Sequence, residues 1–286
     1  MRSILKLIFG NRTPDVLRFA VNGKFKVKID RHHSFLMITN PTSPVANQLF
    51  WGGVFGYEFY VFRIFKCLIQ ECEVFLDVGA NTGYYSLVAA SLNKKLKIFA
   101  FEPLPAAYKY LCKNISLNNF LIQTFPCALS DKKGKAMFYS HKNPKFPDVE
   151  DHLCGDSTLN PDIKLQNRFS FEVFTETLDD LYYNHIYPLK IDFLKLDTEG
   201  SEDLILDGSK KTITECRPIL MIEVLANTIE NKIQLFIESF NYKILEVESG
   251  KPEWVEKIEV TSWKKDYFLI PVEKKEFIMT LLGCKI

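Results

Sequence analysis

The sequence predicts an α/β fold built on an open, doubly wound and mostly parallel sheet. Between residues 73 and 225, short β-rich runs alternate with helical stretches, which is typical of parallel strands joined by right-handed crossovers. Four of the runs are almost continuously apolar, as strands are when helices cover both faces of a sheet. Ligands bind such sheets at the carboxyl ends of the strands, so we expect the functional residues there.

The composition is that of an ordinary globular protein and excludes several functional classes. The chain has 286 residues, of which 47% are hydrophobic and 25% charged, which excludes a disordered or fibrous protein. The net charge of +1 argues against a nucleic-acid partner, because phosphate backbones select basic surfaces. No apolar run approaches the ~20 residues of a membrane span; residues 1–9 allow at most weak peripheral membrane contact. The seven cysteines include no C-x-x-C pair, which favours reduced thiols and a cytoplasmic location. Nothing indicates an oligomeric state.

The chain divides into an extension and a main domain. Residues 1–56 are expected to pack on the core and to contain a β-hairpin around the turn signal Asn22-Gly23. Residues 57–286 would form the main domain. Its polar, proline-containing segment 140–170 interrupts the alternation and is expected to reach over the site. The predicted strands are 74–78, 97–101, 123–129, 192–197, 219–224, 242–247 and 266–271, and the predicted helices are 57–70, 83–92, 104–118, 201–210, 228–240 and 273–282.

The segment FLDVGANTGYYS at 75–86 predicts a nucleoside site. A strand passes through a turn of small residues into a helix, so the backbone can approach a ligand and the helix offers free N–H groups. Asn81 and Tyr84 stand where a dinucleotide fingerprint requires glycines. Glu102 closes the next strand, where a carboxylate can accept both ribose hydroxyls. The alternative is a turn that binds nothing.

The segment DFLKLDTEGSED at 192–203 predicts an acid–base site. Lys195, Asp197 and Glu199 share one face of an extended strand. Glu199 or Asp197 could remove a proton from an alcohol, with Lys195 setting their charge; the alternative is a structural ion pair. Asp197, Glu199 and Glu223 could together hold Mg²⁺, but nothing in the spacing requires it. We therefore predict no metal site and leave a divalent cation as the alternative.

Several motifs occur in the order found in a known family. They are FLDVGANTGYYS, FEPLPAAYKYLCKNISLNN, CALSDKKG, GDSTL, ETLDDL, DFLKLDTEGSEDLILDG, ILMIEVL and DYFLIP. Over residues 57–271 the chain thereby resembles the FkbM type of class I, S-adenosylmethionine-dependent methyltransferases. The resemblance implies a Rossmann-like sheet of seven strands whose last strand, 266–271, is antiparallel. It also implies methyl transfer to a hydroxyl of a sugar, as in polysaccharide biosynthesis, or of a secondary metabolite.

The resemblance also implies roles for individual residues. Asp77, Gly79, Asn81 and Gly83 would hold the methionine part of the cofactor and Glu102 its ribose. Residues expected around the adenine are Pro103, Leu104, Ala128, Leu129 and, near its amino group, Ser130 or Asp131. Glu58 would lie near the cofactor.

We therefore expect an S-adenosylmethionine-dependent O-methyltransferase. An N-methyltransferase acting on an amine or a protein is the alternative among enzymes. DTEG stands at 197–200, where enzymes that methylate nucleic-acid amino groups usually carry N/D-P-P-Y/F/W. An inactive cofactor-binding module is the alternative outside them.

Overall fold

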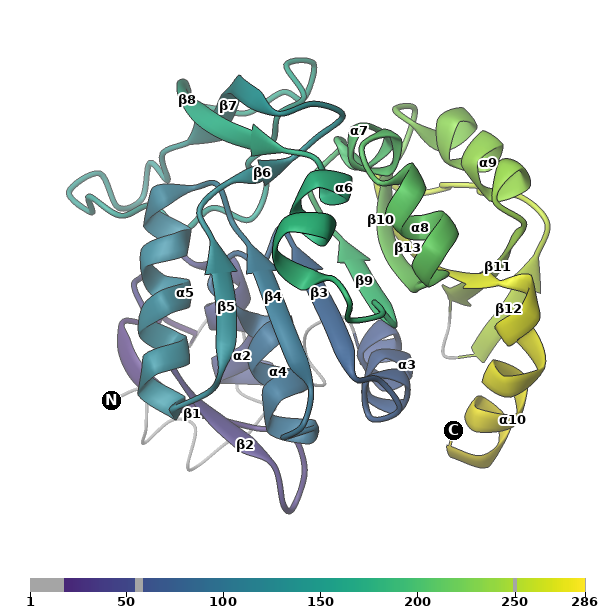
Figure 1. The fold of residues 1–286 in the computed structure, drawn as a ribbon. Helices are drawn as coiled ribbons and strands as arrows, with labels where there is room; N and C mark the ends of the chain where they lie inside the picture. Colours follow the sequence, from purple (N-terminus) through teal and green to yellow (C-terminus); the bar gives the residue numbers. More distant parts are fainter. Residues whose placement is uncertain (1–17, 55–58, 249–250, 286) are drawn as a thin grey trace.

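The computed structural model describes residues 18–54, 59–248 and 251–285, and confirms the predicted fold class (Figure 1). Within these residues the main sheet has the strand order β12-β11-β13-β10-β9-β3-β4-β5. Strands β10, β9, β3, β4 and β5 are mutually parallel, and β13 is antiparallel to both β10 and β11, as predicted. The strands are β3 (Val74–Val78), β4 (Lys97–Phe101), β5 (Ile122–Phe125), β9 (Phe193–Leu196), β10 (Ile219–Leu225), β11 (Tyr242–Glu248), β12 (Lys251–Val255) and β13 (Lys264–Pro271).

Helices cover both faces of this sheet and create two apolar layers (Figure 1). One layer packs under α3 (Phe59–Ile69), α4 (Tyr84–Leu92), α5 (Pro105–Asn118) and α10 (Lys275–Lys285). The other packs under α6 (Leu178–Leu181), η4 (Tyr182–Ile186), α7 (Glu202–Asp207), α8 (Lys210–Cys216) and α9 (Glu230–Ser239). Within the described residues, no helix combines the length and the apolarity needed to cross a membrane.

The structure corrects four details of the prediction. The sheet has eight described strands rather than seven, because β12 forms a hairpin with β11. The predicted strand 123–129 breaks at Pro126, which has no N–H to donate, and β6 (Ala128–Leu129) leaves the main sheet to pair with β8 (Arg168–Glu176). The predicted helix 201–210 is interrupted at Gly208 and continues as the separate helix α8. The N-terminal hairpin turns at residues 29–33 rather than at Asn22-Gly23, because the carboxylate of Asp30 accepts the N–H groups of His32 and His33.

The segment 140–170 mainly connects β7 (Gly134–His141) to β8. These strands form a second sheet with the order β6-β8-β7 above the carboxyl ends of the main strands (Figure 1). Within the connection, Thr158 bridges back to Tyr139, and Leu153 and Thr158 are fully buried. The connection is therefore packed against the body of the protein.

The N-terminal elements are β1 (Gly23–Lys28), β2 (Ser34–Thr39) and α2 (Pro44–Gly52). Strand β2 lies on α5, where Ile38 N donates to Asn114 Oδ1 at 2.7 Å and Leu36 N donates to Asn118 Oδ1 at 2.7 Å. Asn114 Nδ2 also donates to the carbonyl of Thr82 at 2.9 Å. One buried amide thus ties the hairpin to the turn that follows β3. The predicted boundary at residue 56 lies outside the described residues.

Replacing Asn114 should destabilise the protein more than its size suggests. Asn114→Ala would leave the half-buried N–H of Ile38 and the buried carbonyl of Thr82 without these partners, at about 1–3 kcal/mol each. We expect the free energy of unfolding in urea to fall by about 2–4 kcal/mol. Lys113→Ala, on the exposed side of the same helix, is the control and should change it by less than about 0.5 kcal/mol. A loss below about 1 kcal/mol for Asn114→Ala would contradict this link.

Candidate active site

The turn after β3 is held against the end of β9 by a glycine. Gly79 has φ of 77°, and a Cβ there would lie 1.9 Å from the carbonyl oxygen of Asp197. Its N–H and that of Ala80 both donate to the carbonyl of Phe101 at 3.0 Å. The turn therefore touches both neighbouring strands, β4 and β9, which brings the two sequence motifs together at one edge of the sheet.

Asp77 in β3 and Gly83 at the start of α4 lie on either side of this turn. The Asp77 side chain is completely buried, and its Oδ2 accepts from the N–H and the hydroxyl of Ser86 at 3.0 and 2.6 Å. Its burial raises the pKa of the Asp77 carboxyl. Gly83 has φ of 95° and stands at the start of α4. Neither residue lines the cavities described below, so a direct contact with the cofactor stays a prediction for both.

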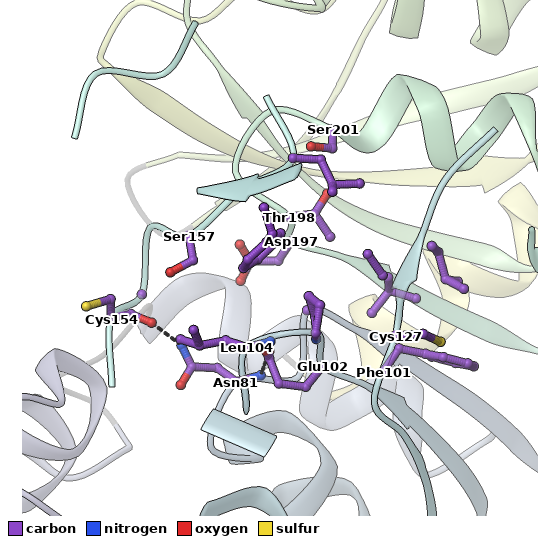
Figure 2. Close-up of a pocket in the computed structure, with 18 residues that line it drawn as sticks. Asn81, Phe101, Glu102, Leu104, Cys127, Cys154, Ser157, Asp197, Thr198 and Ser201 are labelled. Atoms are coloured by element: carbon purple, nitrogen blue, oxygen red, sulfur yellow. Dashed lines mark hydrogen bonds between the residues drawn. The ribbon is translucent and has the colours of Figure 1, made fainter. Parts of the chain in front are cut away.

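A first cavity opens at the carboxyl ends of β3, β4 and β9 (Figure 2). It brings together seven of the residues predicted to bind the cofactor: Gly79, Asn81, Glu102, Pro103, Leu104, Ala128 and Leu129. Its walls are largely apolar, as a purine requires. Asp131 is exposed and does not line it, although it accepts a hydrogen bond from the Ser130 hydroxyl. Glu58 lies outside the described residues.

The Glu102 carboxylate is positioned by two backbone groups. Its Oε2 accepts from Asn81 N and its Oε1 from Leu104 N, both at 2.8 Å. Burial raises the pKa of Glu102 to about 7, against the effect of these two hydrogen bonds. A carboxylate has about four acceptor positions, so each oxygen keeps one for a ligand. This geometry suits the two hydroxyls of a ribose.

The segment between β7 and β8 closes the first cavity. Cys154, Gly155, Ser157 and Leu159 line it, and Asn81 Nδ2 donates to the carbonyl of Cys154 at 3.0 Å (Figure 2). The sequence indicated only that this region reaches the site, through its length and the GDSTL motif. It did not indicate that the segment would bond to the turn after β3.

The buried Lys195 and the half-buried Asp197 form an ion pair at the end of β9. The Lys195 ammonium lies 3.0 Å from Asp197 Oδ2 and 3.7 Å from Asp77 Oδ1. Burial disfavours the Asp197 carboxylate, but the ammonium groups of Lys195 and Lys264 outweigh it and lower the Asp197 pKa. Asp197 therefore stays charged, and its side chain lines the first cavity.

Glu199 differs from Asp197 in its surroundings. It has φ of 55° and its carbonyl accepts the hydroxyl of Thr158 at 2.8 Å. Burial, and then the charge of Asp197, raise the pKa of Glu199 to about 8. A carboxylate with this pKa can take up a proton near neutral pH, as a general base must.

Glu223 joins these two carboxylates. Carboxylate oxygens of Asp197, Glu199 and Glu223 lie within 4.8 Å of one another, and burial raises the pKa of Glu223. The three could supply oxygen ligands to a divalent cation. The Lys264 ammonium already contacts Glu223 there, so the cluster contains a positive charge of its own. The expectation that no metal binds stays a prediction.

A second cavity adjoins the first and shares Gly79, Asn81, Cys154, Gly155 and Asp197 with it. It also contains Lys195 and Glu199. Sequence analysis missed several of its lining residues, among them Thr42, Gln48 and Trp263, since no motif marks them. His141 and Asn143 lie in the segment 140–170 expected to reach over the site and Asp156 lies in the GDSTL motif, but none of the three was singled out as a site residue. His141 Nδ1 lies 3.2 Å from Asp156 Oδ1, and this carboxylate raises the pKa of His141 to about 10.

Four features together define a Rossmann-like methyltransferase of class I: the strand order, the antiparallel β13, the glycine turn and the carboxylate after β4. The chain belongs to the FkbM methyltransferase family: the sequence model of the methyltransferase FkbM domain matches residues 77–270, more than half of the chain.

Named relatives of this chain are also methyltransferases. Methyltransferase sdnD of Sordaria araneosa is 28% identical over 208 residues, 63% of this chain and 76% of sdnD. The 2-O-methyltransferase NoeI of Sinorhizobium fredii is 29% identical over 161 residues, 54% of this chain and 65% of NoeI, just under two thirds of its length. The crystal structure of a methyltransferase FkbM from Methylobacillus flagellatus superimposes with a TM-score of 0.43 at 17% identity, over 70% of this chain and 44% of that one.

The contact of Gly79 with Asp197 can be tested with a matched glycine. Gly23 also has a positive φ, 97°, but no atom lies within 4 Å of a Cβ added there. Gly23→Ala should therefore lower the free energy of unfolding only by the cost of holding an alanine in a left-handed backbone conformation, about 1–2 kcal/mol. Gly79→Ala adds a clash with backbone, so we expect a loss above about 4 kcal/mol in urea unfolding, or no folded protein. Equal losses for the two variants would show that the close approach does not constrain the site.

Proposed function

We propose that the protein is an S-adenosylmethionine-dependent O-methyltransferase that acts on a hydroxyl of a sugar or glycan, or of a secondary metabolite. The observation that carries the proposal is the pair of adjoining cavities, one containing Glu102 and the other Glu199, which share Gly79 and Asp197. A cofactor and an acceptor could thus meet beside one carboxylate pair. The name of the 2-O-methyltransferase NoeI, a family relative, supports oxygen as the acceptor atom.

The first cavity would hold the nucleoside half of the cofactor. Glu102 would accept the ribose hydroxyls, and Leu104, Ala128 and Leu129 would pack on the adenine. Gly79 and Asn81 would face the methionine part, on the turn that Asp77 and Gly83 flank. When bound, S-adenosylmethionine would supply a methyl group on a positively charged sulfur.

The carboxylate pair would serve the acceptor. Glu199 would take the proton of the acceptor hydroxyl, because its raised pKa gives it the greater affinity for a proton. Asp197 would stay ionised through Lys195 and contribute negative charge at the junction of the cavities. The segment around Cys154 would exclude water, so that the hydroxyl rather than water is the nucleophile.

The thiols support a cytoplasmic location. Among the described residues, Cys72, Cys112, Cys127, Cys154 and Cys216 are free thiols. Burial raises the pKa of Cys72 and of Cys127 to about 12, so these two stay unreactive thiols. We propose that the protein works in a reducing compartment.

Removing the Glu102 carboxylate should weaken cofactor binding. A hydrogen bond to a charged group contributes ~1.5–3 kcal/mol, so Glu102→Ala should lower the affinity for S-adenosylhomocysteine roughly 10- to 150-fold by calorimetry. Because burial raises its pKa to about 7, wild-type affinity should fall as the pH drops below 7 and the carboxylate becomes protonated. Glu172→Ala, on the exposed face of β8, is the control. Unchanged affinity in folded Glu102→Ala would remove Glu102 from the cofactor site.

The base can be identified with neutral isosteres. General-base catalysis contributes ~10²–10⁴-fold, so Glu199→Gln should lose about that much turnover while keeping its affinity for S-adenosylhomocysteine. Transfer would be measured from labelled S-adenosylmethionine to a panel of methyl glycosides and phenols. Wild-type turnover should rise with pH towards a plateau above about 8, the pKa of Glu199, and this dependence should vanish in Glu199→Gln.

Two controls complete the experiment on the base. Asp197→Asn should slow transfer without removing the pH dependence, since Asp197 is not the group that titrates near neutral pH. EDTA should leave the wild-type rate unchanged if no metal takes part. The charged groups that face Glu199 are Asp156, Asp197, Glu202, Glu223 and Lys264. Normal turnover in both isosteres would show that the proton leaves by another route.

A further inference from the structure

Three side chains that can bind a metal ion lie together at the end of β7 and on the segment that follows it. They are the imidazole of His141, the thiol of Cys154 and the carboxylate of Asp156, and one ligand atom of each lies within 4.8 Å of the other two. All three residues line the second cavity. They are distinct from the carboxylate cluster that contains Glu223, so the cavity has a second group of potential ligands.

Backbone pairing places the imidazole and the carboxylate opposite each other. Tyr139 and Thr158 form an antiparallel bridge, in which each N–H donates to the carbonyl of the other residue, at 2.8 and 2.9 Å. Continuing this register by two residues brings His141 opposite Asp156. The hydroxyls of the two serines that lie between these pairs are 2.8 Å apart. The hydrogen-bonded backbone therefore sets the position of both side chains.

The Cys154 backbone is held from two directions. Its carbonyl accepts Asn81 Nδ2 at 3.0 Å, and the preceding N–H, that of Leu153, donates to the hydroxyl of Thr42 at 2.8 Å. Figure 2 shows the Cys154 sulfur pointing away from Asn81. The thiol donates to the carbonyl oxygen of His141 at 3.0 Å. Cys154 is thus fixed beside the end of β7 by contacts that do not depend on a bound ligand.

The imidazole and the carboxylate are spaced as two ligands of one ion. His141 Nδ1 lies 3.2 Å from Asp156 Oδ1. The distance permits attraction between charges, but within the described residues the buried Nδ1 makes no hydrogen bond of suitable geometry. Two atoms that bind one zinc ion at about 2.0–2.2 Å in tetrahedral geometry lie roughly 3.4 Å apart. The observed spacing is close to that of neighbouring zinc ligands.

The chemistry of the three groups selects zinc among the common metal ions. Thiolate and imidazole ligands suit Zn²⁺, whereas Mg²⁺ takes oxygen ligands. Three protein ligands leave the fourth tetrahedral position for water or a ligand oxygen. Because all three residues line the second cavity, that position would open onto it.

We propose that His141, Cys154 and Asp156 form a zinc site whose fourth position faces the second cavity. His141 binds through Nδ1, Asp156 through one oxygen, and Cys154 as a thiolate whose proton passes to the solvent on binding. This inference departs from the sequence-based prediction that the chain has no metal site. An oxygen of the acceptor would occupy the fourth position, and only this last assignment rests on the proposed function.

Metal binding can be measured directly on the full chain. The protein is reduced, stripped with EDTA, freed of the chelator and titrated with zinc chloride in competition with a chromophoric chelator. We expect about one zinc ion per chain, which excess magnesium chloride does not displace. Cobalt chloride then replaces zinc chloride, because Zn²⁺ has a filled d shell and gives no such spectrum. The Co²⁺ spectrum should be that of a four-coordinate ion with a thiolate-to-metal charge-transfer band.

Substitutions identify the ligands. Cys154→Ser should abolish the charge-transfer band. Cys154→Ser, His141→Ala and Asp156→Ala should each weaken zinc binding about 100-fold or more, since changes behind a metal ligand already cost roughly 10- to 100-fold. The Asp156 side chain is 44% exposed, so Asp156→Ala tests the site even if a more buried ligand is needed for folding. Matched controls remove the same groups elsewhere and should leave zinc binding unchanged: Cys112→Ser, His185→Ala and Asp162→Ala.

Several results would overturn the inference. They are no zinc binding by the reduced wild-type chain, zinc binding that all three substitutions leave unchanged, and a Co²⁺ spectrum without a thiolate band. Binding that Glu223→Gln removes and Cys154→Ser does not would also overturn it, because the metal would then lie in the carboxylate cluster. Affinity for S-adenosylhomocysteine is measured separately on the zinc-free chain. Its absence would contradict the proposed function and leave the zinc site standing.

Discussion

The site depends on the contact between the turn after β3 and the backbone at the end of β9. Only a glycine allows it, because a Cβ on Gly79 would lie 1.9 Å from the Asp197 carbonyl oxygen. Two consequences follow from this single contact. The N–H groups of the turn reach β4 beside Glu102, and the side chain of Asp197 reaches the junction of the two cavities. Glu102 and the pair of Asp197 and Glu199 are therefore adjacent for a reason of backbone packing.

Buried charge is the second constraint, and it explains why the pKa values of neighbouring carboxyl groups shift in opposite directions. Asp77 and Asp197 flank one ammonium, that of Lys195, and Glu223 contacts that of Lys264. Lys195 lies nearer to Asp197, which stays ionised, whereas burial, and then the charge of Asp197, raise the pKa of Glu199. Removing either lysine would leave buried carboxylates uncompensated, which is costly. One strand end thus carries a permanent charge and a group that can accept a proton.

The sequence predicted the central fold because its signals there are local. Strands 74–78 and 97–101 are continuous apolar runs with clear ends, and their bounds are those of β3 and β4. Strand β12, KPEWV, contains proline and charged residues and carries little strand signal. The turn residues were expected at the site because the motif places them after a strand. Thr42, Gln48 and Trp263 could not be expected there, because only tertiary packing brings them to the cavity.

The N-terminal extension is bonded to both halves of the site, which affects how specificity could change within the family. Through Asn114 it holds the carbonyl of Thr82 in the turn after β3, and through Thr42 and Asn40 it holds residues 151–153 beside the second cavity. The turn after β3, to which we assign the proposed cofactor, lies inside the matched domain, so its chemistry can stay constant. The wall at 42–48 lies outside that domain and can change with little effect on the sheet. Under the proposed function, acceptor choice could then vary through residues of the extension, provided that Asn114 keeps the extension in place.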